Sequence, residues 1–304
     1  MSLKDQKIGF IGLGAMGLGM ATQCLKHEFK LTVNDIRSKP MKQLTKIGAH
    51  PANSVKEVAK QCSTIITVLP TEKEVYEVVL GSNGVFENAR SGTLLMELST
   101  INPATTDTIH AEAKKFGHRV LDAPIGRLAW HAERGESLFM VGGRRADYNL
   151  AMPLFKAMGS TVHYCGKGGS GIRTKLVNNY LAIILCQLNA EALALSQKFK
   201  LNLDTTLEVV HGTTATNGQL KINWPNKVLR NDTDPGFTID LAHKDLSLIL
   251  GAAHQESIPL PVAAAAREAF SSARARGYGS QDFSAMVDSL CDLVKLERAR
   301  IKKS

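Results

Sequence analysis

The stretch Ile8-Gly9-Phe10-Ile11-Gly12-Leu13-Gly14-Ala15-Met16-Gly17, near the start of the 304-residue chain, decides the fold class. An apolar run suited to a strand leads into glycines spaced G-x-G-x-x-G, and a stretch of helical length follows. Such glycines allow a tight turn, a close approach of the backbone to a pyrophosphate, and close packing of helix on strand. The helix N-terminus then faces the phosphates. The predicted cofactor-binding residues of this turn are Gly12, Leu13, Gly14, Ala15, Met16 and Gly17.

An acidic residue further along supports dinucleotide binding over the alternative, a glycine-rich turn that binds nothing. Asp35 stands 21 residues after Gly14, at the end of the next predicted strand, where a carboxylate bonds a ribose diol. The same carboxylate repels the 2′-phosphate of NADP, so NAD is the favoured cofactor. Arg37 is the competing signal, because an arginine there either pairs with such a phosphate or is a solvated loop cation.

The first half of the chain alternates strand-like apolar runs with amphipathic stretches, which is typical of a parallel sheet with crossover helices. Asn102 before Pro103 is a helix cap followed by a first-turn proline. Strands are expected at 7–11, 31–34, 64–69, 93–97, 119–123, 138–141 and 161–164. Helices are expected at 15–26, 38–47, 72–80, 103–116 and 146–158. The predicted class is an α/β Rossmann domain with a mostly parallel sheet.

The pattern changes after Gly166. From 171 to 200, alanine and leucine recur at helical spacing without a proline or a further glycine, which predicts one unusually long helix. Helical periodicity continues in blocks at 203–211, 239–253, 261–276 and 283–301. We therefore predict an NAD-binding domain at 1–166 and an all-helical substrate and dimerisation domain at 167–304, linked by the long helix.

Composition narrows the class of protein. With 44% hydrophobic and 21% charged residues, the chain is expected to be globular rather than disordered or fibrous. Apolar runs such as 181–185 are too short to cross a bilayer, and no secretion signal precedes the first strand, so no membrane partner and a cytoplasmic location are expected. The net charge of +9 fits an anionic partner. Because the basic residues are dispersed, a solvated basic surface is favoured over nucleic-acid binding.

The five cysteines are odd in number and scattered through the chain. They form no C-x-x-C pair and have no histidine at a metal-ligand spacing. We expect free buried thiols, with neither a disulfide framework nor a metal site.

A possible catalytic group opens the long helix. Lys175 and Asn179 are four residues apart and share a helical face, with Asn178 beside them, where the two domains are expected to meet. A desolvated lysine beside a cofactor can exchange a proton with a substrate oxygen. Periodicity alone leaves the other interpretation, a solvated lysine in the first turns of a helix.

Several motifs, in their order and spacing, resemble the β-hydroxyacid dehydrogenases, which include 3-hydroxyisobutyrate dehydrogenase. Besides the glycine turn, they are Glu97-Leu98-Ser99-Thr100, Asp122-Ala123-Pro124-Ile125, Gly171-x-x-x-Lys175-x-x-Asn178-Asn179 and Lys244-Asp245-Leu246. The resemblance implies that Lys175 is the general acid/base and that Asn179 orients the substrate or the lysine. It also implies cofactor contacts from Leu69, Pro70, Thr100 and Lys244, and a substrate contact from Ser99.

One segment departs from the usual pattern of the family. Where Ser-Gly-Gly is usual, this chain has Gly126-Arg127-Leu128. Arginine adds a planar cation with several donors to an anion pocket. This variant resembles the 3-sulfolactaldehyde reductase branch, which implies that Gly126, Arg127 and Asn178 hold a sulfonate. The alternative is a loop arginine that points outward.

The sequence thus predicts an NAD-dependent reductase of a short acidic aldehyde, most specifically 3-sulfolactaldehyde. One alternative is the same chemistry on a carboxylate semialdehyde, such as succinic semialdehyde, tartronate semialdehyde or the 3-hydroxyisobutyrate pair. Another is a dinucleotide-binding interaction module without catalysis. A homodimer or homotetramer is expected from the resemblance.

Overall fold

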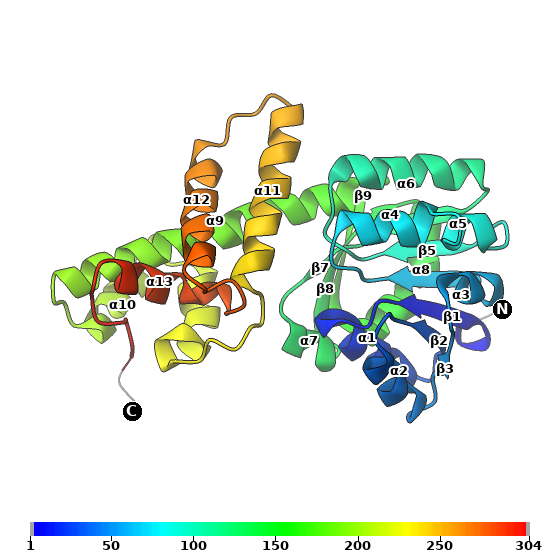
Figure 1. The fold of residues 1–304 in the computed structure, drawn as a ribbon, viewed down its shortest axis with the longest axis horizontal. Coiled ribbons are helices and arrows are strands. Elements are labelled where there is room, and N and C mark those ends of the chain that lie inside the picture. Colours follow the sequence, from blue (N-terminus) through cyan, green and yellow to red (C-terminus); the bar gives the residue numbers. More distant parts are fainter. Residues whose placement is uncertain (1–2, 302–304) are drawn as a thin grey trace. The chain divides into compact units, whose positions relative to one another are not determined.

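The computed structural model describes residues 3–301, which divide into two compact units (Figure 1). The first unit runs up to Lys175 and the second begins at Leu176, so the division falls inside one long helix. The boundary predicted from the sequence, between 166 and 167, lies just before that helix.

The first unit is built on a nine-stranded sheet whose order is β3-β2-β1-β4-β5-β6-β8-β7, with β9 pairing β8. The six strands β1 to β6 run parallel to one another. Strand β8 is antiparallel to β6 and β7, and β9 is parallel to β8. The strands are β1 (Lys7–Ile11), β2 (Lys30–Asn34), β3 (His50–Pro51), β4 (Thr64–Thr67), β5 (Leu94–Glu97), β6 (Arg119–Asp122), β7 (Ile125–Gly126), β8 (Ser137–Gly143) and β9 (Gly159–Gly166). The mostly parallel Rossmann-type sheet predicted from the sequence is confirmed.

The parallel strands end in register. The last residues of β2, β1, β4, β5 and β6 form a single row across the sheet. Asn34 pairs with Ile11, Ile11 with Thr67, Thr67 with Glu97, and Glu97 with Asp122. The loops after these strands therefore leave the same edge of the sheet, which is where ligands bind in open α/β sheets.

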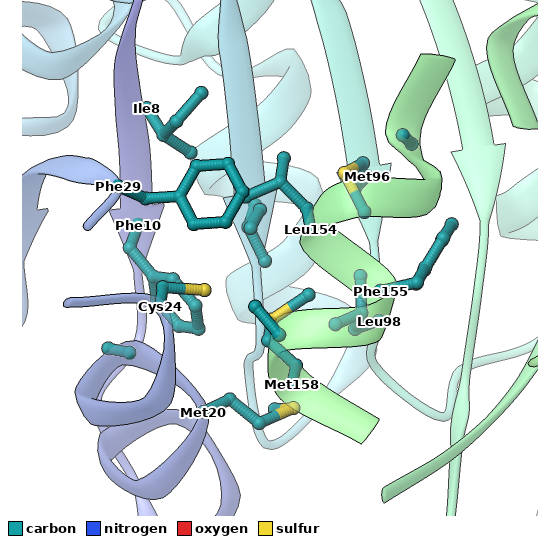
Figure 2. Close-up of a cluster of buried hydrophobic side chains, with 14 of the residues drawn as sticks. Ile8, Phe10, Met20, Cys24, Phe29, Met96, Leu98, Leu154, Phe155 and Met158 are labelled. Atoms are coloured by element: carbon teal, nitrogen blue, oxygen red, sulfur yellow. The ribbon is translucent and has the colours of Figure 1, made fainter. Parts of the chain in front are cut away.

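Helices cover both faces of this sheet, because side chains along each strand alternate between the faces. Their bounds are α1 (Ala15–Lys26), α2 (Ser38–Thr45), α3 (Val55–Gln61), α4 (Glu72–Leu80), α5 (Val85–Asn88), α6 (Pro103–Lys115), α7 (Ala129–Glu133) and α8 (Arg145–Met158). On β1, Phe10 joins a core with α1 and α8, whereas Ile11 joins a core with α3, α4 and α6. Figure 2 shows the first core, in which Phe10 and Phe29 lie near Cys24 and Leu154.

The second unit is helical around its own core. It contains most of α9 (Ser170–Lys198), then α10 (Leu203–His211), α11 (Ile239–Gln255), α12 (Pro261–Ala275) and α13 (Met286–Leu293). Short turns of 3-10 or π helix lie at Gln219–Asn223, Trp224–Asn226 and Val228–Arg230, and they carry the fully buried Trp224 into the core. The all-helical second domain after a long helix is confirmed.

Helix α9 is the one element, within residues 3–301, whose length and apolarity would allow it to cross a membrane. It has 29 residues, and 56% of its most apolar 18-residue window is buried. Buried residues such as Ile183, Cys186 and Leu193 belong to the core of the second unit. The apolar character of α9 is therefore that of a core helix in a folded domain.

Two differences from the sequence prediction concern local structure. The short elements β3, β7, α3, α5 and α7 were not predicted. The block at 283–301 is not one helix, because α13 ends at Leu293 and Lys295 takes a left-handed φ of 55°. Beyond it, Arg298 and Arg300 bond Asp292 and Asp288, which holds the tail against α13 in a non-helical conformation.

Candidate active site

The glycine turn after β1 has the geometry that its spacing predicts. Gly12 has a φ of +92°, and a Cβ there would lie 2.2 Å from the carbonyl oxygen of Val68. A Cβ on Gly17 would lie 2.1 Å from the carbonyl oxygen of Gly12. Neither position has room for a side chain, since the turn packs directly on its neighbours.

The start of α1, by contrast, is open. A Cβ added to Gly14, the N-cap residue, would meet no other atom within 4 Å, and no side chain caps the helix. The unbonded amides of a helix N-terminus attract an anion. Leu13 is buried, Met16 is half-buried and Ala15 is exposed at this turn. The arrangement fits a dinucleotide pyrophosphate, which the backbone amides at the start of α1 would hold.

Asp35, just after β2, closes the turn from the other side. Its Oδ2 accepts from the Leu13 amide at 2.6 Å, and its Oδ1 accepts from the Arg37 amide at 2.8 Å. Burial opposes ionisation, but the hydrogen bonds from Arg37 and Leu13 outweigh it and lower the pKa of Asp35. The carboxylate is thus charged and fixed beside the turn, where a ribose hydroxyl can donate to it.

Arg37 lies on this carboxylate. Its Nε is 3.1 Å from Asp35 Oδ1, and its Nη2 donates to the Leu13 carbonyl at 3.0 Å, while the side chain stays 58% exposed. The guanidinium is therefore an ion-paired group at the rim of the turn and not simply a solvated loop cation. It offsets part of the charge with which Asp35 would repel a 2′-phosphate.

The loops after β4 and β5 are joined by a buried network. Ser99 Oγ accepts from the Leu69 amide at 2.9 Å, and the Ser99 amide donates to both oxygens of Glu97, at 3.0 and 3.1 Å. Burial raises the pKa of Glu97 to about 7. Around this network Pro70 is exposed and Thr100 is half-buried. Glu97 and Ser99 therefore fix the backbone of the predicted cofactor-lining loops.

Lys175 lies at the last position of the first unit and is only 8% exposed. Its Nζ donates to the carbonyl oxygen of Ile125 at 2.6 Å. Ile125 and the buried Gly126 form β7, so the ammonium is held beside the segment predicted to bind substrate. A lysine amino group at this place can exchange a proton with a substrate oxygen.

Arg127 takes a different position from the one expected of a sulfonate ligand. It has a left-handed φ of 71° and is exposed. Its Nη1 donates to the Glu136 carbonyl at 2.5 Å and to Ser160 Oγ at 2.8 Å, and its Nη2 donates to Thr161 Oγ1 at 3.1 Å. In this conformation the guanidinium braces the loop before α7 against β9.

In the second unit, the Asp245 carboxylate contacts two residues singled out from the sequence, and a third is bonded to one of these two. Asn179 Nδ2 donates to Asp245 Oδ2 at 2.7 Å, and Asn179 Oδ1 accepts from Asn178 Nδ2 at 3.0 Å. Lys244 Nζ lies 3.1 Å from Asp245 Oδ1. The orientation of the Asn179 amide is thus set by hydrogen bonds at both of its ends.

Sequence reasoning gave no role to Glu97 or Asp245, although both stand in quoted motifs. The sequence did hold a signal for both: Glu97 stands two residues before the predicted Ser99, and Asp245 directly follows the predicted Lys244. Each is at most 3% exposed, and buried acids are found almost only where they are bonded.

Within residues 3–301, no group of three or more His, Cys, Asp or Glu side chains is placed to hold a metal ion. All five cysteines are free thiols, and four of them are buried.

A Rossmann sheet, an open helix N-terminus after the glycine turn and a carboxylate after the second strand define a dinucleotide-binding site of the kind that NAD(P)-dependent oxidoreductases use. Comparison with known families agrees. Residues 7–166 match the NAD-binding domain of 6-phosphogluconate dehydrogenase, and residues 169–290 match the NAD-binding domain of NADP-dependent 3-hydroxyisobutyrate dehydrogenase. The chain belongs to the 3-hydroxyisobutyrate dehydrogenase-like family of β-hydroxyacid dehydrogenases.

Similar proteins span almost the whole chain. The 3-sulfolactaldehyde reductase of Escherichia coli (strain K12) is 41% identical over 93% of this chain and 95% of its own length. The 2-(hydroxymethyl)glutarate dehydrogenase of Eubacterium barkeri is 32% identical over 93% of this chain and 94% of its own. A solved structure of Mycobacterium tuberculosis 3-hydroxyisobutyrate dehydrogenase with L-serine has a TM-score of 0.87 at 27% identity, covering 95% of this chain and 99% of that one.

Proposed function

We propose that this enzyme uses NADH to reduce a short aldehyde bearing an acidic group, most specifically 3-sulfolactaldehyde to 2,3-dihydroxypropane-1-sulfonate. The observation that carries the reaction class is the buried Lys175 ammonium, 2.6 Å from the Ile125 carbonyl. The substrate rests on the 41% identity to the 3-sulfolactaldehyde reductase of E. coli and on the Gly126-Arg127 segment, which resembles that branch of the family.

NADH held at the glycine turn and Asp35 would supply the hydride for the carbonyl carbon. Lys175 donates the proton that the carbonyl oxygen needs as it becomes a hydroxyl. The ammonium also stabilises the negative charge that develops on this oxygen before the proton is transferred. Asn179, whose amide is oriented by Asp245, positions the substrate or the lysine.

NAD is the proposed cofactor, with NADP less favoured. Asp35 is ionised, with Oδ2 bonded to Leu13 of the glycine turn and Oδ1 bonded to the Arg37 amide, so it can accept from ribose hydroxyls but disfavours a 2′-phosphate. Leu69, Pro70, Thr100 and Lys244 are the further proposed cofactor contacts. For the substrate, we propose Ser99, Gly126, Arg127 and Asn178.

A carboxylate semialdehyde is the second candidate substrate, and the position of Arg127 favours it. The guanidinium is already bonded to Glu136, Ser160 and Thr161, so binding a sulfonate requires it to leave these partners. The 2-(hydroxymethyl)glutarate dehydrogenase of E. barkeri, 32% identical to this chain, is named for a carboxylate substrate. A binding module without catalysis is the third candidate, and it gives no role to the buried Lys175.

The experiment is NADH oxidation with 3-sulfolactaldehyde, succinic semialdehyde, tartronate semialdehyde and a neutral aldehyde of similar size. The proposal predicts the highest kcat/KM for the sulfonated aldehyde. A higher value for a carboxylate semialdehyde moves the assignment to the second candidate, and no turnover of any aldehyde supports the binding module.

Arg127→Gly tests whether Arg127 holds the sulfonate, by comparing 3-sulfolactaldehyde with a neutral aldehyde. If Arg127 holds the sulfonate, its loss lowers kcat/KM for 3-sulfolactaldehyde about ten- to a hundred-fold, because a charge-assisted hydrogen bond contributes roughly 1.5 to 3 kcal/mol. A neutral aldehyde should lose less. Equal losses on both substrates would show that Arg127 only braces the loop.

We also propose a homo-oligomer, either a dimer or a tetramer. Exposed apolar side chains follow one face of α9 and its C-terminal end at intervals of four and seven residues, namely Val177, Leu181, Leu188, Leu195 and Phe199. We call them the α9 stripe. A stripe of this length suits burial against another helix.

We also propose a cytoplasmic location, as predicted from the sequence. Fractionation of the producing cells tests it.

A further inference from the structure

Asp122, the last residue of β6, is a buried carboxylate to which the proposed mechanism gives no role. Only 1% of the residue is exposed. Its Oδ1 accepts from the Gly169 amide at 2.8 Å, and its Oδ2 accepts from the Ile172 amide at 3.0 Å. Gly169 directly precedes α9, and Ile172 lies in its first turn. Asp122 therefore caps this helix from a distance of 50 residues in sequence.

This cap lies one turn before Lys175. The first amides of a helix have no partner within the helix and carry partial positive charge. A carboxylate bonded to two of them forms charge-assisted bonds, which are shorter and stronger than neutral ones. Ile172 precedes Lys175 by three residues, so the carboxylate fixes the turn from which the lysine side chain extends.

Helix α6 holds the same turn from a second direction. His110 Nε2 lies 3.0 Å from Asp122 Oδ1, and Asp107 accepts from Arg173 at 3.0 and 2.7 Å. Asp107 and His110 are three residues apart on α6, so they share one face of it. The turn is thus bonded both to the end of β6 and to α6.

The backbone of the turn has no room to shift towards the sheet. A Cβ on Gly171 would lie 2.3 Å from the Met140 carbonyl oxygen and 2.4 Å from that of Asp122. The start of α9 therefore rests directly on β6 and β8. At the end of this rigid turn, Lys175 Nζ reaches the Ile125 carbonyl, three residues after Asp122.

From this geometry we propose that Asp122 is a positioning residue for proton transfer, which it controls by fixing the first turn of α9 and hence the place of the Lys175 ammonium. The inference rests on the proposed role of Lys175. Loosening the cap shifts the ammonium relative to the substrate oxygen without touching the glycine turn or Asp35. The chemical step should slow while cofactor binding is unchanged.

The test is Asp122→Asn in the full-length enzyme, with the aldehyde that the wild type reduces fastest. The asparagine has one acceptor oxygen, and its NH2 group faces one of the two helix amides, so one capping bond is lost. We expect kcat to fall about 10- to 100-fold, because small misplacements of reacting groups have effects of this size. The KM for NADH should stay within about twofold, and the pH profile of kcat should shift.

Asp147→Asn is the matched control. Asp147 is a carboxylate of the same unit, 2% exposed and bonded to Arg119, and it lies on α8 without a hydrogen bond to α9 among the described residues. It should lose thermal stability as Asp122→Asn does, with kcat and its pH profile unchanged. Gly171→Ala, which pushes the turn off the sheet while keeping Asp122, should lower kcat like Asp122→Asn.

Two results would overturn the inference. One is a folded Asp122→Asn enzyme with the kcat and pH profile of the wild type. The other is a loss of kcat in Asp147→Asn as large as that in Asp122→Asn. Lys175→Ala, assayed in parallel, separates this from failure of the proposed function: if Lys175→Ala is inactive and Asp122→Asn is normal, only the role of Asp122 is wrong.

Discussion

Asp35 shows how a single carboxylate can influence cofactor choice through its own hydrogen bonds. Both of its oxygens accept backbone amides, and Arg37 pairs with it. The ion pair leaves a fixed negative group at the turn and a cation at its rim. The carboxylate repels the 2′-phosphate of NADP and the guanidinium attracts it, so the stronger of these two effects decides between NAD and NADP.

We expect NADH to bind more tightly than NADPH, because ribose hydroxyls can donate to Asp35 whereas a 2′-phosphate is repelled by it. Asp35→Asn should weaken NADH binding by roughly ten- to a hundred-fold, as a hydrogen bond to a charged group contributes roughly 1.5 to 3 kcal/mol. Fluorescence titration with both cofactors measures this. Tighter binding of NADPH by the wild type would identify Arg37 as a phosphate ligand instead.

Glu97 predicts a pH dependence of stability. Burial raises the pKa of Glu97 to about 7, compared with about 4.3 for an unfolded glutamate. The folded state therefore binds a proton that the unfolded state has already lost between these values. The contribution of Glu97 to the free energy of unfolding is fully present below about pH 4 and is lost as the pH rises through about 7.

Glu97→Gln, which stays neutral, should flatten the decline of Tm between about pH 5 and 8 that Glu97 causes. Thermal melts across this range, followed by circular dichroism, provide the measurement. Glu87→Gln, at an exposed glutamate of α5, is the control and should keep the slope of the wild type. An identical slope in Glu97→Gln and the wild type would mean that this carboxyl does not titrate with unfolding.

At the scale of elements, length decided what could be predicted. Strands such as β1 and helices such as α10 have enough residues for an apolar period, and their bounds were predicted exactly. The two-residue strands β3 and β7 have no period, and they exist because neighbouring strands provide backbone partners. The tail after α13 has helical periodicity but is not helical. Its Arg298 and Arg300 bond Asp292 and Asp288 of α13, which holds the tail against that helix.

The α9 stripe carries the prediction about assembly. Its five side chains are 48% to 66% exposed, which is costly for an apolar surface of this extent in a lone subunit. We expect a dimer or tetramer by sedimentation, and a shift to monomer for the double variant Leu181→Glu and Leu188→Glu. Ile258→Glu, outside the stripe, is the control. A wild type that sediments at 32.9 kDa would refute the oligomer.

Across the whole molecule, the residues predicted from motifs and those missed differ in kind. Gly12 and Gly17 were predicted because glycine at that spacing already indicates a tight dinucleotide-binding turn, whereas the role of Lys175 was predicted from the resemblance to a known family. The buried acids Glu97, Asp122 and Asp245 were quoted without a role, because their function depends on which amides and side chains reach them after folding. A turn motif is local in sequence, whereas the partners of these carboxylates lie up to 66 residues away.

The central claim is that this chain reduces an acidic aldehyde with the proton of Lys175. The most direct test is kcat for NADH-dependent reduction of 3-sulfolactaldehyde by the wild type and by Lys175→Ala, at saturating concentrations of both substrates. The account predicts a loss of about 100-fold or more in kcat, with NADH binding nearly unchanged. Lys175→Ala turning over at close to the wild-type rate would contradict it.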